Sequence, residues 1–410
     1  MHWALLMKTK LGRRTRDEKT RLKTKVSGRL EHVKESAIRR FIELAAKSED
    51  VIHFEHGEPN FSTPLHIVEA ATKAMKDGLT HYGSTRGSLE LRNAIFEKLT
   101  RENGLPIDGP EEVLVVSGTQ EAMFLAAMTF LQTGDEALIL DPYYPAYFED
   151  TLIAGARPVP VPLSPGNGYR VEAEYLEHYV TPKTRMVWLD SPVNPTGHVF
   201  SKKDLEEVAA VVERNDLLVF SDEIYEKLIY DGVEHVSVGS LPGMENRVIT
   251  SNGFSKCYAM AGWRIGYVAG DKKLIDVMGK LHYYTVLCPN TIAEKGALAA
   301  LIGPQDCVRD MVQEYDQRRL AVLEALRKIE GISFVPPKGA FYVFPNISRF
   351  NKNDETIAET LIQQFSVATV PGSGFGRGGA GHLRLSYSVP MTEIEEGLNR
   401  FQKGLQHFVS

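Results

Sequence analysis

The chain has few cysteines, no long apolar run and no excess of positive charge. Three cysteines among 410 residues are too few for a disulfide framework and favour a reducing compartment. No apolar stretch approaches the roughly 20 residues that a membrane-spanning helix needs. The formal net charge of -6 gives the whole chain no attraction to nucleic acid or an anionic membrane. Together these absences predict a cytoplasmic protein that binds neither.

Metal-binding spacings are also missing. The histidines form no H-E-x-x-H pattern and the cysteines no C-x-x-C pair, so we expect no catalytic metal. Basic residues crowd positions 8–25, with only Asp17 and Glu18 against them. This predicts that residues 1–28 are a solvated basic tail, or that the true start is Met7. The same segment is too short to hold a separate domain.

Short apolar runs alternate with amphipathic stretches through the middle of the chain. Strands buried on both faces read as continuous apolar runs. Six runs have this character: 113–116, 137–140, 186–189, 217–220, 248–249 and 265–268. Helical patterns such as 121–131 and 203–214 lie between several of them. The alternation predicts βαβ units, and therefore an α/β fold with a mostly parallel sheet between helices.

The pattern changes after about residue 302. A long helix is expected at 306–329, a strand at 341–344, a helix at 355–365 and a strand pair at 367–370 and 383–386. This predicts a smaller α+β domain, since a chain of this length usually exceeds one core. The expected division is a tail at 1–28, the N-terminal part of the small domain at 29–55, a large domain at 56–301 and the C-terminal small domain at 302–410.

The strongest local signal is the segment 251–266, S-N-G-F-S-K-C-Y-A-M-A-G-W-R-I-G. Lys256 follows a predicted strand among small residues, which suits a carbonyl cofactor that needs the backbone nearby. A lysine must lose its proton before it attacks a carbonyl, and a desolvated pocket or a nearby cation favours that loss. Arg264 supplies a planar, permanent cation for a phosphate. Taken alone, the two residues also fit a surface pair.

Three further motifs place polar groups where predicted strands end. Asp222 closes the strand in V-F-S-D-E-I-Y, with Tyr225 three residues on, and Asn194 lies in the turn N-P-T-G. The motif S-G-T-Q at 117–120 joins a strand to a helix N-terminus, where backbone N–H groups and the helix dipole favour a phosphate. Each motif alone also fits a helix cap or an ordinary turn.

Together the motifs resemble the signature of class I and II aminotransferases, over nearly the whole chain from about Gly28 onward. The resemblance implies a pyridoxal 5′-phosphate-dependent transferase of fold type I, with cofactor bound by the large domain. It implies that Lys256 carries the cofactor as a Schiff base and moves a proton. It also implies that Asp222 keeps the ring nitrogen protonated and that Tyr225 hydrogen-bonds the ring oxygen.

The resemblance extends to the remaining ligands of cofactor and substrate. It implies phosphate contacts from Gly118, Thr119, Gln120 and Arg264, and stacking on the ring by Tyr144, with Tyr143 as the alternative. Asn194 would bond the ring oxygen and the substrate carboxylate, Gly57 would let the backbone approach the substrate, and Arg384 would grip the α-carboxylate. Tyr82 would reach the phosphate of a neighbouring subunit, which implies a homodimer.

The sequence departs from the family pattern at two places. Many members have a hydroxyl three residues before the lysine, where this chain has Gly253; Ser251 or Ser255 could compensate. The cations that read a distal carboxylate in aspartate-specific members are missing, both at Thr119 and in 283–290. These absences favour neutral or aromatic side chains, which the aromatic Tyr283, Tyr284 and Phe375 also suggest.

The resulting prediction is an aminotransferase that moves an amino group from an L-amino acid to a 2-oxo acid, with 2-oxoglutarate the expected acceptor. A lyase, decarboxylase or synthase would share Lys256, Asp222, Tyr225 and Arg384, so no residue excludes these reactions. A non-catalytic sensor built on the same fold would carry a winged-helix domain ahead of it, and residues 1–28 are too few for one.

Overall fold

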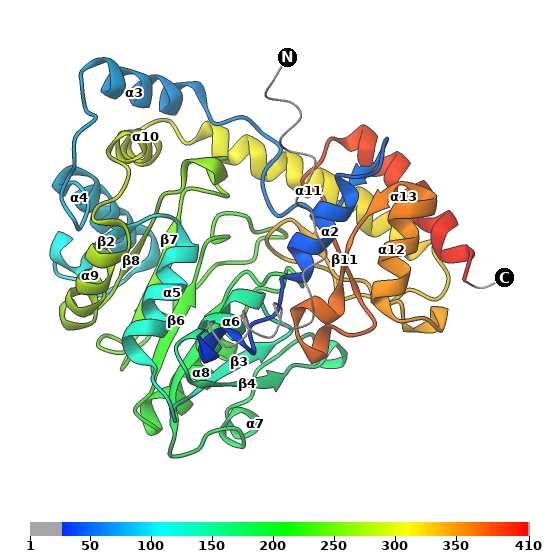
Figure 1. Ribbon diagram of the computed structural model, residues 1–410, viewed down its shortest axis with the longest axis horizontal. Helices are drawn as coiled ribbons and strands as arrows, with labels where there is room; N and C mark the ends of the chain where they lie inside the picture. The colour runs from blue at the N-terminus through cyan, green and yellow to red at the C-terminus, as the bar shows by residue number, and fades with distance from the viewer. Residues whose placement is uncertain (1–26, 409–410) are drawn as a thin grey trace, which may run out of the picture.

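A seven-stranded sheet occupies the centre of the computed structural model, which describes residues 27–408 (Figure 1). In spatial order its strands are β2 (Val113–Val116), β8 (Gly266–Ala269), β7 (Val248–Gly253), β6 (Leu218–Asp222), β5 (Thr184–Asp190), β3 (Glu136–Asp141) and β4 (Arg157–Pro162). Only β8 runs antiparallel to its neighbours. The mostly parallel α/β sheet expected from the apolar runs is therefore confirmed.

Alternate residues of the central strands feed two separate cores. On β3, Leu138 and Leu140 pack with α8 (Lys202–Arg214) and α7 (Ala173–Glu177). Ala137 and Ile139 point the other way, into a core with α5 (Thr119–Phe130), α6 (Pro145–Ile153) and α9 (Lys272–Val286). Successive strand side chains face opposite sides, so a continuous apolar run is needed where helices cover both faces.

Strand β4 is absent from the strands that the sequence predicts. It reads R-P-V-P-V-P, and its three prolines hide the strand pattern. Proline lacks the N–H that a central strand must donate, so it is confined largely to sheet edges. The structure places β4 at the edge, paired only with β3, where one side of the backbone needs no partner strand.

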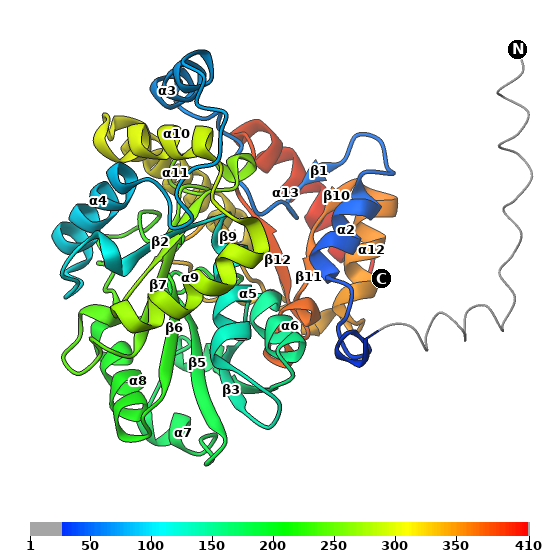
Figure 2. The same ribbon diagram turned by 60° about the vertical axis from the view of Figure 1, so that its left-hand side comes forward.

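A smaller unit of strands and helices lies beside the central sheet (Figure 2). Its strands are β1 (Ile52–His53), β9 (Tyr342–Val343), β10 (Val367–Ala368), β11 (Val370–Pro371) and β12 (Leu383–Ser386). Its helices are α2 (Ala37–Ala45), α11 (Asp306–Arg327), α12 (Asp354–Phe365) and α13 (Met391–Gln406). Most of these elements share one apolar core, so segments from both ends of the chain fold together.

Two details of this smaller unit differ from the sequence prediction. The predicted strand pair is split, because β10 pairs with β1 while only β11 pairs with β12. Helix α13 was not predicted at all. The boundaries at 29–55, 56–301 and 302–410 stay a prediction, and most of the predicted tail at 1–28 lies outside the described residues.

The remaining helices are α3 (Leu65–Lys76), α4 (Leu89–Lys98) and α10 (Thr291–Ile302), which pack in a third core near β2 and β8. Across residues 27–408, none of the helices has the length and apolar character that crossing a membrane requires.

Candidate active site

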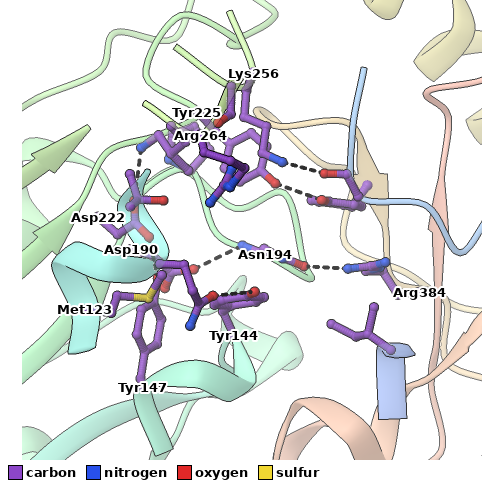
Figure 3. A pocket seen from close by; sticks show the side chains of 18 residues that line it. Met123, Tyr144, Tyr147, Asp190, Asn194, Asp222, Tyr225, Lys256, Arg264 and Arg384 are labelled. Atoms are coloured by element: carbon purple, nitrogen blue, oxygen red, sulfur yellow. Dashed lines mark hydrogen bonds between the residues drawn. The ribbon is translucent and has the colours of Figure 1, made fainter. Parts of the chain in front are cut away.

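A cavity of about 230 Å³ opens between the central sheet and the smaller unit. It lies at the carboxyl ends of β5 and β6, the edge where open parallel sheets commonly bind ligands. The predicted site residues that line it are Gly57, Thr119, Gln120, Tyr144, Asn194, Asp222, Tyr225, Lys256, Arg264 and Arg384. Figure 3 shows most of these side chains converging from separate elements.

Lys256 enters the cavity from the turn after β7. Its Nζ donates to the carbonyl oxygen of Gly57 at 2.5 Å. Burial lowers the pKa of this lysine to about 8, and the Arg384 and Arg264 cations lower it further, against the opposing charge of Glu58. A larger fraction of Lys256 is therefore neutral near pH 7 than of an ordinary lysine, and the neutral amine is the form that attacks a carbonyl.

This pKa sets the pH dependence of cofactor capture. Because the reactive form is the unprotonated one, the rate at which the cofactor-free protein captures added pyridoxal phosphate should rise with pH and reach half its maximum near pH 8. An ordinary lysine would reach that point near pH 10.4. The rise of the cofactor absorption band after mixing measures the rate. A midpoint above pH 10 would contradict the assigned environment.

Asp222 ends β6 and points into the cavity. Its carboxylate accepts from the backbone N of Ile224 at 3.2 Å and from the hydroxyl of Tyr147 at 3.1 Å. Burial raises the pKa of this carboxyl to about 6, while these two bonds and the Lys256 charge lower it. The carboxylate faces no arginine or lysine within salt-bridge distance among the described residues. Such a group would be stabilised by a cation in the cavity, and a protonated pyridine nitrogen would supply one.

The sequence analysis missed Asp190, which also lines the cavity. It stands opposite Asp222 in the pairing of β5 with β6. Its Oδ2 accepts from the backbone N of Asn194 at 3.1 Å, which holds the N-P-T-G turn in place. Burial and the neighbouring Asp222 charge raise its pKa well above the usual value. The signal was available, because Asp190 directly follows the strand predicted at 186–189.

The other end of the cavity suits a phosphate. Helix α5 begins there, with Gly118 as its N-cap, so free N–H groups and the helix dipole face the space. A side chain at Gly118 would bring a Cβ within 2.5 Å of the Arg264 guanidinium. Arg264 itself adopts φ 53°, an uncommon conformation for a non-glycine residue that functional sites often contain. The residues present thus fit a phosphorylated cofactor.

Steric crowding explains why position 253 is a glycine. A Cβ there would lie 3.1 Å from the Cα of Gly266 and 3.2 Å from the carbonyl oxygen of Ile265. The close approach of β7 and β8 therefore leaves little space for a hydroxyl side chain. Ser255 lines the cavity, whereas Ser251 is fully buried and does not. Of the two candidates left open by the sequence, only Ser255 is placed to compensate.

Arg384 presents a buried cation at the substrate end. It is 1% exposed, and its Nη1 donates to Asn194 Oδ1 at 3.2 Å and its Nη2 to the Glu55 carbonyl oxygen at 2.6 Å. Its Nε has no hydrogen-bond partner, and within residues 27–408 it forms no salt bridge. Burying an unpaired charge is costly. The arrangement therefore favours an anion from outside, such as a substrate carboxylate.

Tyr342 is a second residue that sequence reasoning missed. Its hydroxyl lies 2.7 Å from that of Tyr225, and its ring lies under the Arg384 guanidinium at 4.5 Å. A Cβ at Gly57 would come within 3.1 Å of the same hydroxyl. Tyr342 therefore contacts the side chain predicted to bind the cofactor, Tyr225, and the one predicted to bind the substrate, Arg384, and it lies close to the backbone of Gly57. Its strand, 341–344, was predicted, but nothing local in the sequence joins it to Tyr225.

Some predicted residues lie elsewhere. Tyr144 lines the cavity, with its hydroxyl 3.2 Å from Gln120 Oε1, whereas Tyr143 packs on Phe148 outside it. The stacking alternative Tyr143 is therefore not supported. Tyr82 is 84% exposed and does not line the cavity of its own chain. Tyr283 and Tyr284 are also exposed, while Phe375 packs against Arg384 at 5.1 Å.

The fold and the site define a class of protein, the pyridoxal-phosphate-dependent transferases. The chain belongs to the class I and II aminotransferase family, whose model matches residues 49–401. It is 43% identical to the aspartate aminotransferase of Pyrococcus abyssi, over 93% of this chain and 98% of the relative. It is 41% identical to aromatic-amino-acid aminotransferase 2 of Thermococcus litoralis, again over 93% and 98%.

Comparison with solved structures supports the same family assignment. The aspartate aminotransferase of Thermus thermophilus with maleate superposes with a TM-score of 0.87 at 37% identity, covering 92% of this chain and 99% of the other. A Pyrococcus protein superposes with a TM-score of 0.90 at 43% identity, covering 92% and 98%. The protein is therefore an aminotransferase that uses pyridoxal 5′-phosphate and acts on amino and oxo acids. A lyase, decarboxylase, synthase or sensor is not favoured.

Proposed function

We propose that the enzyme transfers the amino group of an L-amino acid with an apolar or aromatic side chain to a 2-oxo acid, with 2-oxoglutarate as the acceptor. The observation that carries the specificity is the cavity lining. Its cations within the described chain are Lys256, Arg264 and Arg384, and each has a task in the proposal. The apolar part of the lining includes Ile38 and Met123, so this chain offers no further cation in the cavity for a distal carboxylate.

The substrate end depends on Arg384 and Asn194. The guanidinium fork would bind the α-carboxylate in a bidentate manner, and its bonds to Asn194 and the Glu55 carbonyl fix its orientation. The Tyr342 ring below supplies a cation–π contact. Binding the carboxylate here would place the amino group and Cα of the substrate toward Lys256.

The reacting end depends on Lys256, Asp222 and Tyr225. When bound, pyridoxal phosphate supplies an electron sink for the carbanion that forms at Cα. Lys256, as a neutral amine, would take the proton from Cα and return it in the other direction of the cycle. Asp222 would accept a hydrogen bond from the ring nitrogen and favour its charged form. The Tyr225 hydroxyl, aligned by Tyr342, would donate to the ring oxygen.

A donor panel tests the specificity. With 2-oxoglutarate held constant, phenylalanine, tyrosine and leucine should give kcat/KM values at least about tenfold above aspartate, because no paired cation offsets the desolvation of a second carboxylate. Relatives named aspartate aminotransferase support the rival outcome. Aspartate as the best donor would overturn the specificity and leave amino-group transfer intact.

We also propose that the active unit is a homodimer in which Tyr82 completes the site of the partner. The support is the family resemblance together with an exposed tyrosine that its own chain does not use. Tyr82→Phe should weaken cofactor retention by about tenfold, equivalent to one hydrogen bond of roughly 1.4 kcal/mol to a charged group. Dialysis followed by absorption measures retention, and sedimentation should show an unchanged dimer.

The matched control is Tyr284→Phe, which changes another tyrosine that is 84% exposed. It should retain cofactor like the wild type. Equal retention in Tyr82→Phe would remove Tyr82 from the site. A monomeric wild-type enzyme with full activity would remove the dimer as well.

A cytoplasmic location is the last part of the proposal. The three cysteines are all unpaired in the structure, as expected in a reducing compartment.

A further inference from the structure

Two histidines and a glutamate converge beside the substrate end of the cavity. His53 ends β1, and Glu55 and His56 follow it in the segment that leads to Gly57. The Nδ1 of His53 lies 2.7 Å from Glu55 Oε1, and the Nε2 of His56 lies 3.6 Å from the same oxygen. One potential ligand atom from each side chain lies within 4.8 Å of the others. The cluster therefore has three donors around one small volume.

Glu55 is the unusual member of this cluster. Its side chain is 0% exposed, and its Oε2 has no hydrogen-bond partner among residues 27–408. Within the described part of the chain, no lysine or arginine forms a salt bridge with it. Buried carboxylates are normally paired or bound to a metal, because desolvating the charge is costly. The two histidines contact only Oε1, so Oε2 gains a partner when a cation is bound by both carboxylate oxygens together with the ring nitrogens.

We propose that His53, Glu55 and His56 form a binding site for a divalent transition-metal ion of the zinc class. Zinc is bound by His nitrogen at about 2.0–2.1 Å and by carboxylate oxygen at about 2.0–2.2 Å, so tetrahedral ligands lie roughly 3.3–3.5 Å apart. The separation of 3.6 Å between His56 Nε2 and Glu55 Oε1 is close to this spacing. The 2.7 Å between His53 Nδ1 and Glu55 Oε1 is a hydrogen-bond distance, and it would widen by roughly 0.6–0.8 Å when the ion binds. The histidines are 36% and 38% exposed, which leaves a path for the ion and for water as a fourth ligand.

A second group of possible metal ligands differs from the His53, Glu55 and His56 cluster in being neutralised by its own neighbours. Glu223, Glu226 and His235 also gather their ligand atoms within 4.8 Å. There, however, the Lys98 ammonium already pairs with Glu226, and Asn103 donates to both carboxylates. That cluster is neutralised by the chain itself. The Glu55 cluster contains no such cation.

The ion would stabilise one wall of the active site. The Glu55 carbonyl oxygen accepts from Arg384, and the Gly57 carbonyl oxygen accepts from Lys256. A metal bound to the side chains of 53–56 would restrict this segment and so hold both acceptors in place. The role is structural, since none of the three side chains lines the cavity.

Zinc titration of the holoenzyme, without amino acids and against a chromophoric chelator, tests the site. We expect one high-affinity zinc per chain, a rise in Tm on loading, and visible bands when cobalt replaces zinc. Glu55→Gln and His56→Asn should each weaken binding at least about tenfold, since even outer-shell changes cost 10–100-fold. Both should abolish the zinc-dependent rise in Tm.

The control is His178→Ala, an exposed histidine that bonds only to its own helix, and it should bind zinc like the wild type. If Glu55→Gln fails to fold, His56→Asn still decides the outcome, because that side chain lies at the surface. No zinc bound at micromolar concentration by the wild type would overturn the proposal. Equal affinity in His56→Asn and the wild type would overturn it too.

Discussion

Replacing Lys256 by alanine is expected to lower kcat by about 10⁴-fold or more. A positioned general base alone contributes on the order of 10²–10⁴-fold, and this variant also loses the amine that captures the cofactor. The cavity holds no second lysine in its described lining that could substitute. Steady-state kinetics with saturating pyridoxal phosphate measure the loss, and the absorption band of the lysine-bound cofactor should disappear.

Lys256→Arg distinguishes the effect of the positive charge at this position from the effect of the reactive amine. Arginine keeps a cation next to the Gly57 carbonyl but stays protonated, so it should be as inactive as alanine. Lys256→Ala should keep the Tm of the cofactor-free wild type within a few degrees, because removing a buried, partly protonated amine relieves a desolvation cost. A loss smaller than about 10²-fold in Lys256→Ala would assign the proton transfer to another group.

Asp222→Asn is expected to lower kcat/KM by about 10²–10³-fold, the usual effect of removing one preorganised electrostatic partner from a site. Asparagine preserves the shape and can still accept from the backbone N of Ile224, while its amide N–H₂ would donate to the Tyr147 hydroxyl; the negative charge is removed. The ring nitrogen would then lack the anion that favours its protonated form. Kinetics and the wavelength of the bound cofactor are the two readouts, and both should change.

The control for Asp222 is Asp150→Asn. Asp150 is also a buried carboxyl, with its pKa raised to about 7 by burial, but it does not line the cavity. Its asparagine variant should keep wild-type kcat/KM. An Asp222→Asn enzyme with kcat/KM within about tenfold of wild type would show that the ring nitrogen does not depend on this carboxylate.

Much of the fold is readable from the sequence because the central strands are buried on both faces. The apolar runs at 113–116 and 186–189 lie within β2 and β5. Strand β4 was not predicted because its prolines are incompatible with a central strand and are tolerated only at a sheet edge. The separation of β10 from β11 was not predicted either, because β10 pairs with β1, which lies more than 300 residues away in the sequence.

The site was predictable where its residues belong to local motifs. Lys256, Asp222 and Asn194 each end or follow a strand, and the parallel sheet brings such ends to one edge. Tyr342 was not predictable in this way, because it reaches Tyr225 through the packing of the smaller unit. Tyr82 belongs to a third group, since its proposed partner lies on another chain.

The candidate metal ligands were not predicted from the sequence for a different reason. Metal motifs are usually sought at helical or loop spacings such as H-E-x-x-H. Here the spacing is H-x-E-H, in which only His53 belongs to the two-residue strand β1 and Glu55 stands at a bend after it. Only the unpartnered Glu55 oxygen in the folded chain distinguishes this cluster from scattered surface histidines.

The absorption spectrum of the purified holoenzyme tests the central claim most directly. A panel of L-amino acids is added one at a time, followed by 2-oxoglutarate after each has reacted. The account predicts a yellow band that particular amino acids bleach and that the 2-oxo acid restores, because both half-reactions use the same Lys256. A band that every amino acid leaves unchanged, or that no 2-oxo acid restores, would contradict amino-group transfer at this site.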